Sequence, residues 1–157
     1  MKRLTGLAIF LVLAFVGAGI GLRLAGHDPA VWHVDPASAK RPGRDNDFLI
    51  APEGAVAATP DAVSAVHPVA PDVLLFQFDA VARNSPRVSV VAGSVEEGRI
   101  TYVQRSLVLG FPDYITVNAV PAGDGAALVV WSRSRYGYSD VGVNRERVER
   151  WLAGMGG

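Results

Sequence analysis

The pattern of hydrophobic and polar positions divides the 157-residue chain into three parts. Residues 4–22 are uncharged and largely apolar, and a helix needs about 20 such residues to cross a bilayer. The next segment is polar and interrupted by prolines, which exclude a long helix there. Beyond it, apolar residues recur at the spacings of strands and helices. The pattern predicts a membrane anchor over residues 1–24, a juxtamembrane linker over residues 25–46 and a small domain over residues 47–157.

Two segments of the predicted domain have helical spacing. Residues 71–83 begin with a proline, which a first helical turn accepts, and end shortly before another proline. Their apolar stripe consists of Leu74, Leu75, Phe78 and Val81. The second helix is predicted to start at Asn144, a good N-cap residue, and to end near Gly154. Its apolar stripe consists of Val148, Trp151, Leu152 and Met155.

Between these helices, apolar residues alternate with polar ones, as they do in strands with one buried face. Turn sequences at residues 93–98, 110–112 and 121–125 separate the alternating segments. Residues 47–52 add a short edge strand, and residues 53–69 an extended segment that wraps around the domain. The predicted fold class is therefore α+β. It is a two-layer domain in which an antiparallel sheet meander carries both helices on one face, preceded by one N-terminal transmembrane helix.

The charges around the apolar segment predict its orientation. Lys2 and Arg3 precede the segment, and positive charge favours the cytoplasmic side, so the C-terminal domain is expected outside the cytoplasm. A cleaved signal peptide is the alternative, because Val16, Gly17 and Ala18 fit a small-residue cleavage site. The apolar run continues beyond that site, which favours an uncleaved anchor. The chain has no cysteine, which excludes a lipoprotein.

Composition and motifs narrow the classes of function. Fifteen basic residues balance fifteen acidic ones, and no basic cluster alternates with aromatic residues, so no nucleic-acid partner is expected. The sequence contains no phosphate loop, dinucleotide fingerprint or Gly-x-Ser-x-Gly elbow, so we expect no cofactor and favour a non-enzymatic role. Four linker residues are of metal-ligating types: His27, Asp28, His33 and Asp35. Their spacing matches no metal motif, so no metal site is expected.

Residues 132–149 combine charge, glycine and a helix start more densely than ordinary surface does. The candidate binding residues of this corner are Arg133, Arg135, Asp140, Asn144, Arg145 and Arg147. In one interpretation, Asp140 forms a bidentate pair with an arginine that fixes the loop, while Asn144 caps the helix. In the other, strand-end arginines and N–H groups at the helix start hold an anion such as phosphate or carboxylate. Arg133 and Arg135 share a face if the strand continues that far.

The run Ser-Arg-Tyr-Gly-Tyr-Ser-Asp-Val-Gly-Val-Asn-Arg-Glu-Arg-Val-Glu over residues 134–149 resembles the C-terminal motif of a bacterial and plastid family, the domain of unknown function fourteen-ninety-nine. Gly110 and Phe111, followed by Asp113, are similar to a second element of that family. The resemblance covers roughly residues 71–152, and the chain lacks the cysteine-containing N-terminal segment of commoner members. The pairing of both elements in the family motivates the hypothesis that Asp113, a secondary candidate, meets Arg135. The resemblance implies a fold and a motif but no activity.

Three functions are compatible with these observations. The leading one is a single-pass protein of the bacterial inner membrane, anchored through residues 4–22. Its periplasmic domain would be a non-catalytic binding or interaction module, with a small anionic ligand or an envelope protein as its partner. The second is a structural or assembly component of an envelope complex, which presents apolar side chains of the wrapping segment. The third is an enzyme that uses Asp140 or Asp113 together with arginines.

Overall fold

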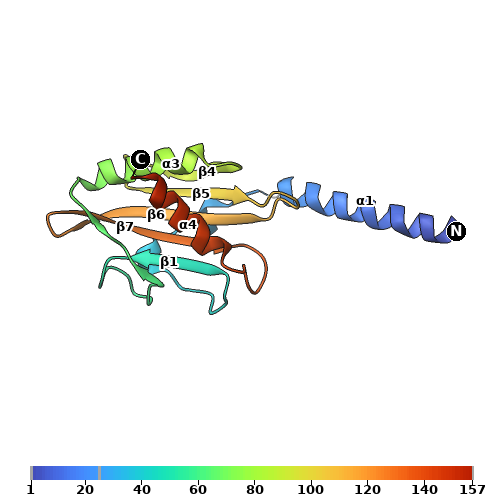
Figure 1. Cartoon of the computed structure of the whole chain (residues 1–157), viewed down its shortest axis with the longest axis horizontal. Coiled ribbons are helices and arrows are strands. Elements are labelled where there is room, and N and C mark those ends of the chain that lie inside the picture. Colours follow the sequence, from blue (N-terminus) through green and yellow to red (C-terminus); the bar gives the residue numbers. More distant parts are fainter. Residues whose placement is uncertain (1, 25, 157) are drawn as a thin grey trace.

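The computed structural model describes residues 2–24 and 26–156, and its elements are labelled in Figure 1. The helices are α1 (Lys2–Leu24), α2 (Pro29–Trp32), the 3-10 helix η1 (Pro36–Ser38), α3 (Pro71–Asn84) and α4 (Val143–Gly154). The strands are β1 (Asp47–Ala51), β2 (Ala62–Val63), β3 (Val66–His67), β4 (Val88–Ser94), β5 (Arg99–Arg105), β6 (Pro112–Ala122) and β7 (Gly125–Ser134). The two helices predicted from apolar spacing are therefore confirmed as α3 and α4.

The strands of the described residues form one seven-stranded sheet in the order β2-β1-β7-β6-β5-β4, with β3 also paired to β7. Strands β4 to β7 form the predicted antiparallel meander. The sheet as a whole is mixed, because β2 runs parallel to β1. Two short strands thus lie in the segment predicted to be a plain extended wrap. The carboxylate of Asp61 accepts a hydrogen bond from the backbone N–H of Leu49 (2.8 Å) and holds the returning chain beside β1. Strand β1 was predicted as an edge strand but lies between β7 and β2.

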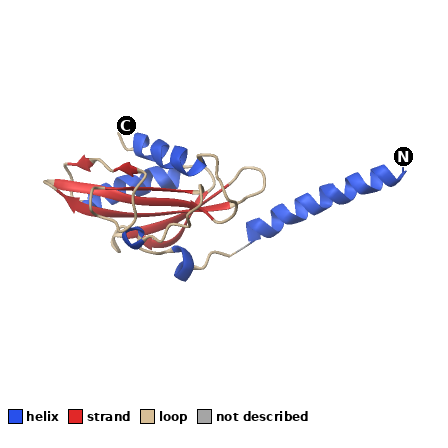
Figure 2. Ribbon diagram, turned by 90° about the horizontal axis from the view of Figure 1, so that it is seen from below, coloured by secondary structure: helices blue, strands red, loops and turns tan. Residues whose placement is uncertain are grey.

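Helices α3 and α4 pack on one face of the sheet, as predicted (Figure 2). Their apolar stripes meet the inward side chains of the central strands in a single buried cluster. Phe78 from α3, Tyr102 from β5 and Trp151 from α4 form its aromatic centre, with ring centroids 5.7 to 6.3 Å apart. This core fixes α4, and with it the charged residues of its first turns, against the sheet.

The opposite face of the sheet is covered by the chain that follows α1. Helix α2, η1 and their loops lie across it (Figure 2). Trp32 stacks on Tyr114 of β6, with ring centroids 3.7 Å apart, and its carbonyl accepts a hydrogen bond from Arg133 of β7 (2.6 Å). The residues that we expected to form a juxtamembrane linker therefore lie against the sheet. Their prolines and small side chains suit a flat covering layer.

Helix α1 projects from the end of the sheet at which the β5–β6 loop lies (Figure 1). Its side chains Leu7, Phe10, Leu13 and Phe15 are exposed. Among the described residues, no helix has the length and apolar character that crossing a membrane requires. The transmembrane helix predicted from the sequence is therefore not confirmed by the structure.

Candidate functional site

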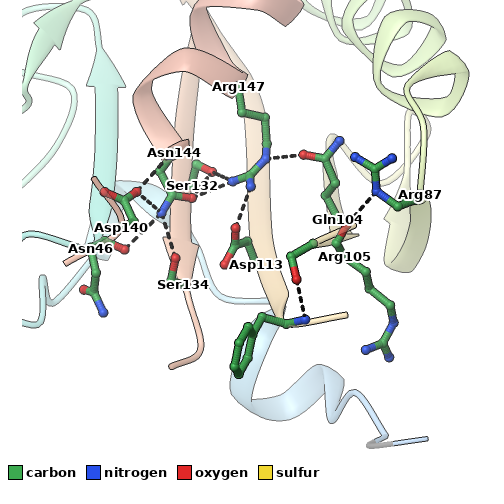
Figure 3. Close-up of polar contacts among 12 residues, drawn as sticks. Asn46, Arg87, Gln104, Arg105, Asp113, Ser132, Ser134, Asp140, Asn144 and Arg147 are labelled. Carbon is green, nitrogen blue, oxygen red and sulfur yellow. Dashed lines mark hydrogen bonds and ion pairs between the residues drawn. The ribbon is translucent and has the colours of Figure 1, made fainter. Parts of the chain in front are cut away.

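Arg147 is the centre of a buried polar network beneath α4 (Figure 3). Its side chain is directed at the sheet and only 3% of the residue is exposed. Its Nη2 donates to the carboxylate of Asp113 on β6, and its Nε donates to Oε1 of Gln104 on β5. Its Nη1 donates to Oδ1 of Asn144 (2.6 Å) and to Oγ of Ser132 on β7 (2.9 Å). One guanidinium thus ties the helix to three neighbouring strands.

Asn144 and Asp140 extend this network to the start of α4. Oδ1 of Asp140 accepts from the backbone N–H of Gly142 (2.9 Å), and Oδ2 accepts from that of Asn144 (2.8 Å). Asn144 itself is fully buried, and its Nδ2 lies within hydrogen-bonding distance of Ser134 Oγ (3.0 Å) and of the carbonyl of Asn46 (3.1 Å). The network therefore also reaches the residue before β1.

The prediction that Asn144 caps the helix is wrong. The helix begins at Val143, after Gly142, which occupies the N-cap position with a positive φ of 85°. The Asp140 carboxylate satisfies N–H groups of the first turn, so the side chain of Asn144 is available to bind the sheet. The structural interpretation of the corner was also wrong about the partner of its arginine, since Arg147 pairs with Asp113 and not with Asp140.

Arg133 and Arg135 lie on the opposite face of the sheet from this network. They share a face, as predicted, because side chains alternate along β7. Arg133 is buried over the ring of Trp131, 4.0 Å from its centroid, and burial lowers its pKa to about 10. Arg135 donates to the hydroxyl of Tyr114 (3.4 Å) and to the carbonyl of Gly26 (3.2 Å). The hypothesis that Asp113 meets Arg135 is therefore wrong, because the alternation directs them to different faces.

Arg145 occupies a third location. Its guanidinium lies 4.5 Å from the centroid of the Phe48 ring, and it forms an exposed ion pair with Glu149 (3.6 Å). The candidate residues predicted as one corner are thus distributed over the buried network, the opposite sheet face and the outer surface of α4. The structure brings together Arg147, Asn144, Asp140 and Asp113.

His27 and His33, which follow α1, are held by contacts within the fold. His27 Nδ1 lies 2.7 Å from the hydroxyl of Tyr114, and its Nε2 lies 2.9 Å from Nη2 of Arg105. His33 Nδ1 lies 2.9 Å from Thr101 Oγ1. Asp28 and Asp35 accept hydrogen bonds at the starts of α2 and η1. In the part of the chain that the structure describes, no three His, Cys, Asp or Glu residues are grouped to hold a metal.

These two histidines predict a pH dependence of stability. Burial, followed by the charges of Arg105 and Arg135, lowers the pKa of His27, and burial, followed by Arg99, lowers that of His33. The unfolded chain therefore binds more protons once the pH falls below about 6.5. The free energy of unfolding should be constant just above that pH and decrease below it.

The double substitution His27→Gln and His33→Gln is expected to flatten this dependence between neutral pH and the range in which carboxylates titrate. Denaturant unfolding of the wild type and the double variant at a series of pH values measures how the free energy of unfolding depends on pH. Equal slopes for wild type and variant would contradict the assignment to these histidines.

A pocket of about 240 Å³ opens beside the Asp113–Arg147 pair. We name it the arginine pocket, and it is lined by Arg87, Gln104, Arg105, Ser106, Asp113, Val143, Glu146, Arg147 and Arg150. A second pocket of about 300 Å³, which includes Phe111 and Tyr136, shares three of these residues, Ser106, Asp113 and Val143. Asp113 therefore lies between a basic pocket and a partly aromatic one. Guanidinium groups in such a pocket suit phosphate or carboxylate, which they bind through paired N–H donors.

Sequence reasoning missed several residues of this region. Gln104 lies on the same face of β5 as the buried Ile100 and Tyr102. A polar residue at a position where the alternation predicts a buried apolar one could have indicated a buried polar contact. Arg87 had no such signal. It adopts a positive φ of 60°, unusual for a side chain of its size, and its Nε donates to the carbonyl of Arg105 (2.9 Å) (Figure 3). This contact fixes the β4 end of the pocket.

The sequence model of one protein family, described as "Protein of unknown function (DUF1499)", matches residues 30–155. The chain belongs to this family. The match begins within α2, so the family region includes the layer that covers the second sheet face as well as the network beneath α4. No curated protein and no solved structure was found to match the chain. The resemblance to the domain of unknown function fourteen-ninety-nine family is thereby confirmed, over a longer region than its motifs indicated.

Proposed function

We propose that this member of the DUF1499 family is a membrane-anchored binding module whose arginine pocket holds the anionic group of a ligand. The observation that carries the proposal is the composition of that pocket. Among the described residues that line it, three arginines besides Arg105 stand against two carboxylates, those of Asp113 and Glu146.

The excess of positive charge in the pocket comes from arginines outside the network. Arg147 and Asp113 neutralise each other in a pair whose side chains are 4% and 15% exposed. Arg87 and Arg150 then outnumber the single carboxylate of Glu146, whereas the guanidinium of Arg105 binds the carbonyls of Leu22 and Gly110 on the other side of β5. Clefts lined by one sign of charge concentrate the field and attract ligands of the opposite sign. The buried pair supports the floor of the pocket, and the other arginines supply the attraction.

The proposed anchor is α1. Its uncharged stretch over residues 4–22 is close to the length that spans a bilayer, and several of its apolar side chains are exposed. The basic residues Lys2 and Arg3 favour a cytoplasmic N-terminus, which would place the domain on the periplasmic side of a bacterial inner membrane. An anchored module of this kind would meet its anionic ligand at the membrane surface or as a group on an envelope protein.

A role in assembly has support of its own. An apolar pocket of about 340 Å³ lies between α4 and the segment that contains β2 and β3, and Val63 and Val66 are exposed near it.

The enzymatic alternative has less support from the geometry. Asp140 accepts backbone N–H bonds at the start of α4, and Asp113 is paired with Arg147, so both carboxylates already have structural roles.

Phosphate binding tests the proposal. We expect inorganic phosphate, titrated calorimetrically into the full chain in lipid nanodiscs at low ionic strength, to bind the wild type. Arg150→Gln should weaken this binding by about tenfold, because one charge-assisted contact is lost. The matched control is Arg145→Gln, which changes an exposed arginine on the same helix outside the arginine pocket and should bind as the wild type does. Absence of binding, or an equal loss in both variants, would contradict the proposal.

A further inference from the structure

The β5–β6 loop, residues 106–111, is attached to the end of α1. Nη1 of Arg105 donates to the carbonyl of Leu22 (2.8 Å), one of the last carbonyls of the helix. Nη2 of Arg23 donates to the carbonyls of Leu107 and Val108 (3.2 Å each). A side chain next to the loop thus binds the helix, and a side chain of the helix binds the loop. The position of the loop therefore depends on that of α1.

The loop also reaches back along the helix. Gly19 is buried, and a Cβ atom placed on it would lie 3.9 Å from the carbonyl oxygen of Leu109 and 4.0 Å from Leu109 Cδ2. Gly19 is three residues before Leu22, where the uncharged stretch ends. At about 1.5 Å of rise per residue, the contact lies roughly 4.5 Å inside that stretch. If α1 enters the bilayer, Leu109 reaches the depth of its apolar part.

The tip of the loop is apolar and exposed. Leu107 is 70% exposed and Val108 is 67% exposed. The sequence Ser-Leu-Val-Leu-Gly-Phe over residues 106–111 carries no charge. Next to it, Phe111 and Tyr136 place their ring centroids 6.0 Å apart, and Tyr138 is exposed in the loop between β7 and α4. Aromatic side chains of this kind are favoured at the interface between lipid and water.

Arginines flank this apolar tip. Arg23 is at the end of α1, and Arg105 is the last residue of β5. Guanidinium groups beside an apolar insertion suit the phosphate level of a bilayer, and their aliphatic stems extend toward the hydrocarbon. Both guanidinium groups donate to carbonyls of the loop itself, Arg23 to Leu107 and Val108 and Arg105 to Gly110, so the charges remain beside the apolar tip.

From these contacts we propose that the β5–β6 loop inserts Leu107, Val108 and Leu109 into the lipid leaflet beside α1, and so holds this end of the sheet on the membrane surface. The inference rests on the proposed membrane anchor. Lipid is favoured over a protein partner because the loop packs directly on the helix that would enter the bilayer, within its uncharged stretch. With the loop inserted, the domain is oriented and not free to rotate on its anchor.

Site-specific fluorescence tests the insertion in the full chain. The protein has no cysteine, so a single introduced cysteine provides a unique position for an environment-sensitive label. The test position is Val108→Cys. The matched control is Asp124→Cys, which lies in the turn between β6 and β7 at the other end of the sheet (Figure 1). Val16→Cys in α1 reports on the anchor itself. The variants are reconstituted in phosphatidylcholine and phosphatidylglycerol vesicles that contain a lipid with a spin label on its acyl chain.

The expected result is several-fold stronger lipid quenching at position 108 than at position 124, together with strong quenching at position 16. Quenching at 16 without quenching at 108 would overturn the insertion and leave the proposed anchor intact. Lack of quenching at 16 would contradict the anchor and the insertion together. Protection of position 108 from aqueous iodide without lipid quenching would show that protein covers the loop, which also overturns the inference.

Discussion

Replacing Arg147 with alanine is expected to lower the free energy of unfolding by about 3–5 kcal/mol, the range for removing one partner of a buried ion pair. The loss leaves the Asp113 carboxylate without its arginine, and it removes the donors to Gln104, Asn144 and Ser132. Gln104, Asn144 and Ser132 are buried, and the side chain of Asp113 is only 15% exposed, so water replaces the lost arginine poorly. Denaturant unfolding of the full chain in detergent, followed by the fluorescence of the buried Trp151, measures the change.

The control for this variant is Arg145→Ala on the same helix. Its exposed ion pair and ring contact should contribute only about 0–1 kcal/mol. A loss below about 1 kcal/mol for Arg147→Ala would mean that the Asp113 side chain finds water or another partner. Arg147 would then be available to a ligand, and the division between supporting network and binding pocket would be incorrect.

Asn144→Ala is expected to lower the free energy of unfolding by about 3 kcal/mol, because each buried polar group left without a partner costs roughly 1–3 kcal/mol. The substitution removes the acceptor of Ser132 and Arg147 and the donor to the carbonyl of Asn46. Since the carbonyl of Asn46 lies next to β1, the loss should also loosen the strand that carries Phe48 and Ile50 into the core.

The matched control is Asn84→Ala at the exposed end of α3, which we expect to stay within about 0.5 kcal/mol of wild type. A double-mutant cycle with Arg147→Ala should give a coupling energy of about 0.5–3 kcal/mol, because the two side chains are in direct contact. Additive losses would show that Asn144 and Arg147 act separately, against the interpretation of one cooperative network.

The two kinds of site place different demands on their residues. The network beneath α4 consists of buried groups that satisfy one another, and its energetic role is to hold the helix in one register on the sheet. The arginine pocket consists largely of exposed side chains at the rim, such as Arg87 and Arg150, which the network does not use. Substitutions in the first should reduce stability, and substitutions in the second should reduce ligand affinity.

At Asn144, tertiary contacts outweigh the local preference of asparagine for the N-cap position. Asparagine is a favoured N-cap residue, and the prediction used that preference. In the fold, the Asp140 carboxylate satisfies the N–H groups instead, and Asn144 enters the interior because Ser132, Ser134 and Asn46 lie directly beneath it. A cap preference depends on near neighbours, whereas this outcome depends on a strand ten residues away and on a residue before β1.

The register of the strands and the docking of α4 decide which arginine pairs with Asp113. In the pairing of β6 with β7, Asp113 lies opposite Ser134, so the neighbouring Arg133 and Arg135 point to the other face. Arg147 reaches Asp113 because the core residues Val148 and Trp151 dock α4 at that position. Sequence identified the carboxylate and the group of candidate arginines, but it contained no direct information on which pair would meet.

Periodicity in the sequence determined the two main helices, the four-strand meander and the face on which the helices pack, because these depend on residues that are neighbours along the chain. Its motifs also determined the family. Tertiary structure alone decided the parallel β2, the layer over the second sheet face, the Asp113–Arg147 pair and the arginine pocket. Each of these joins residues far apart in sequence, and their meeting depends on strand register and helix docking, which the packing of the whole core sets.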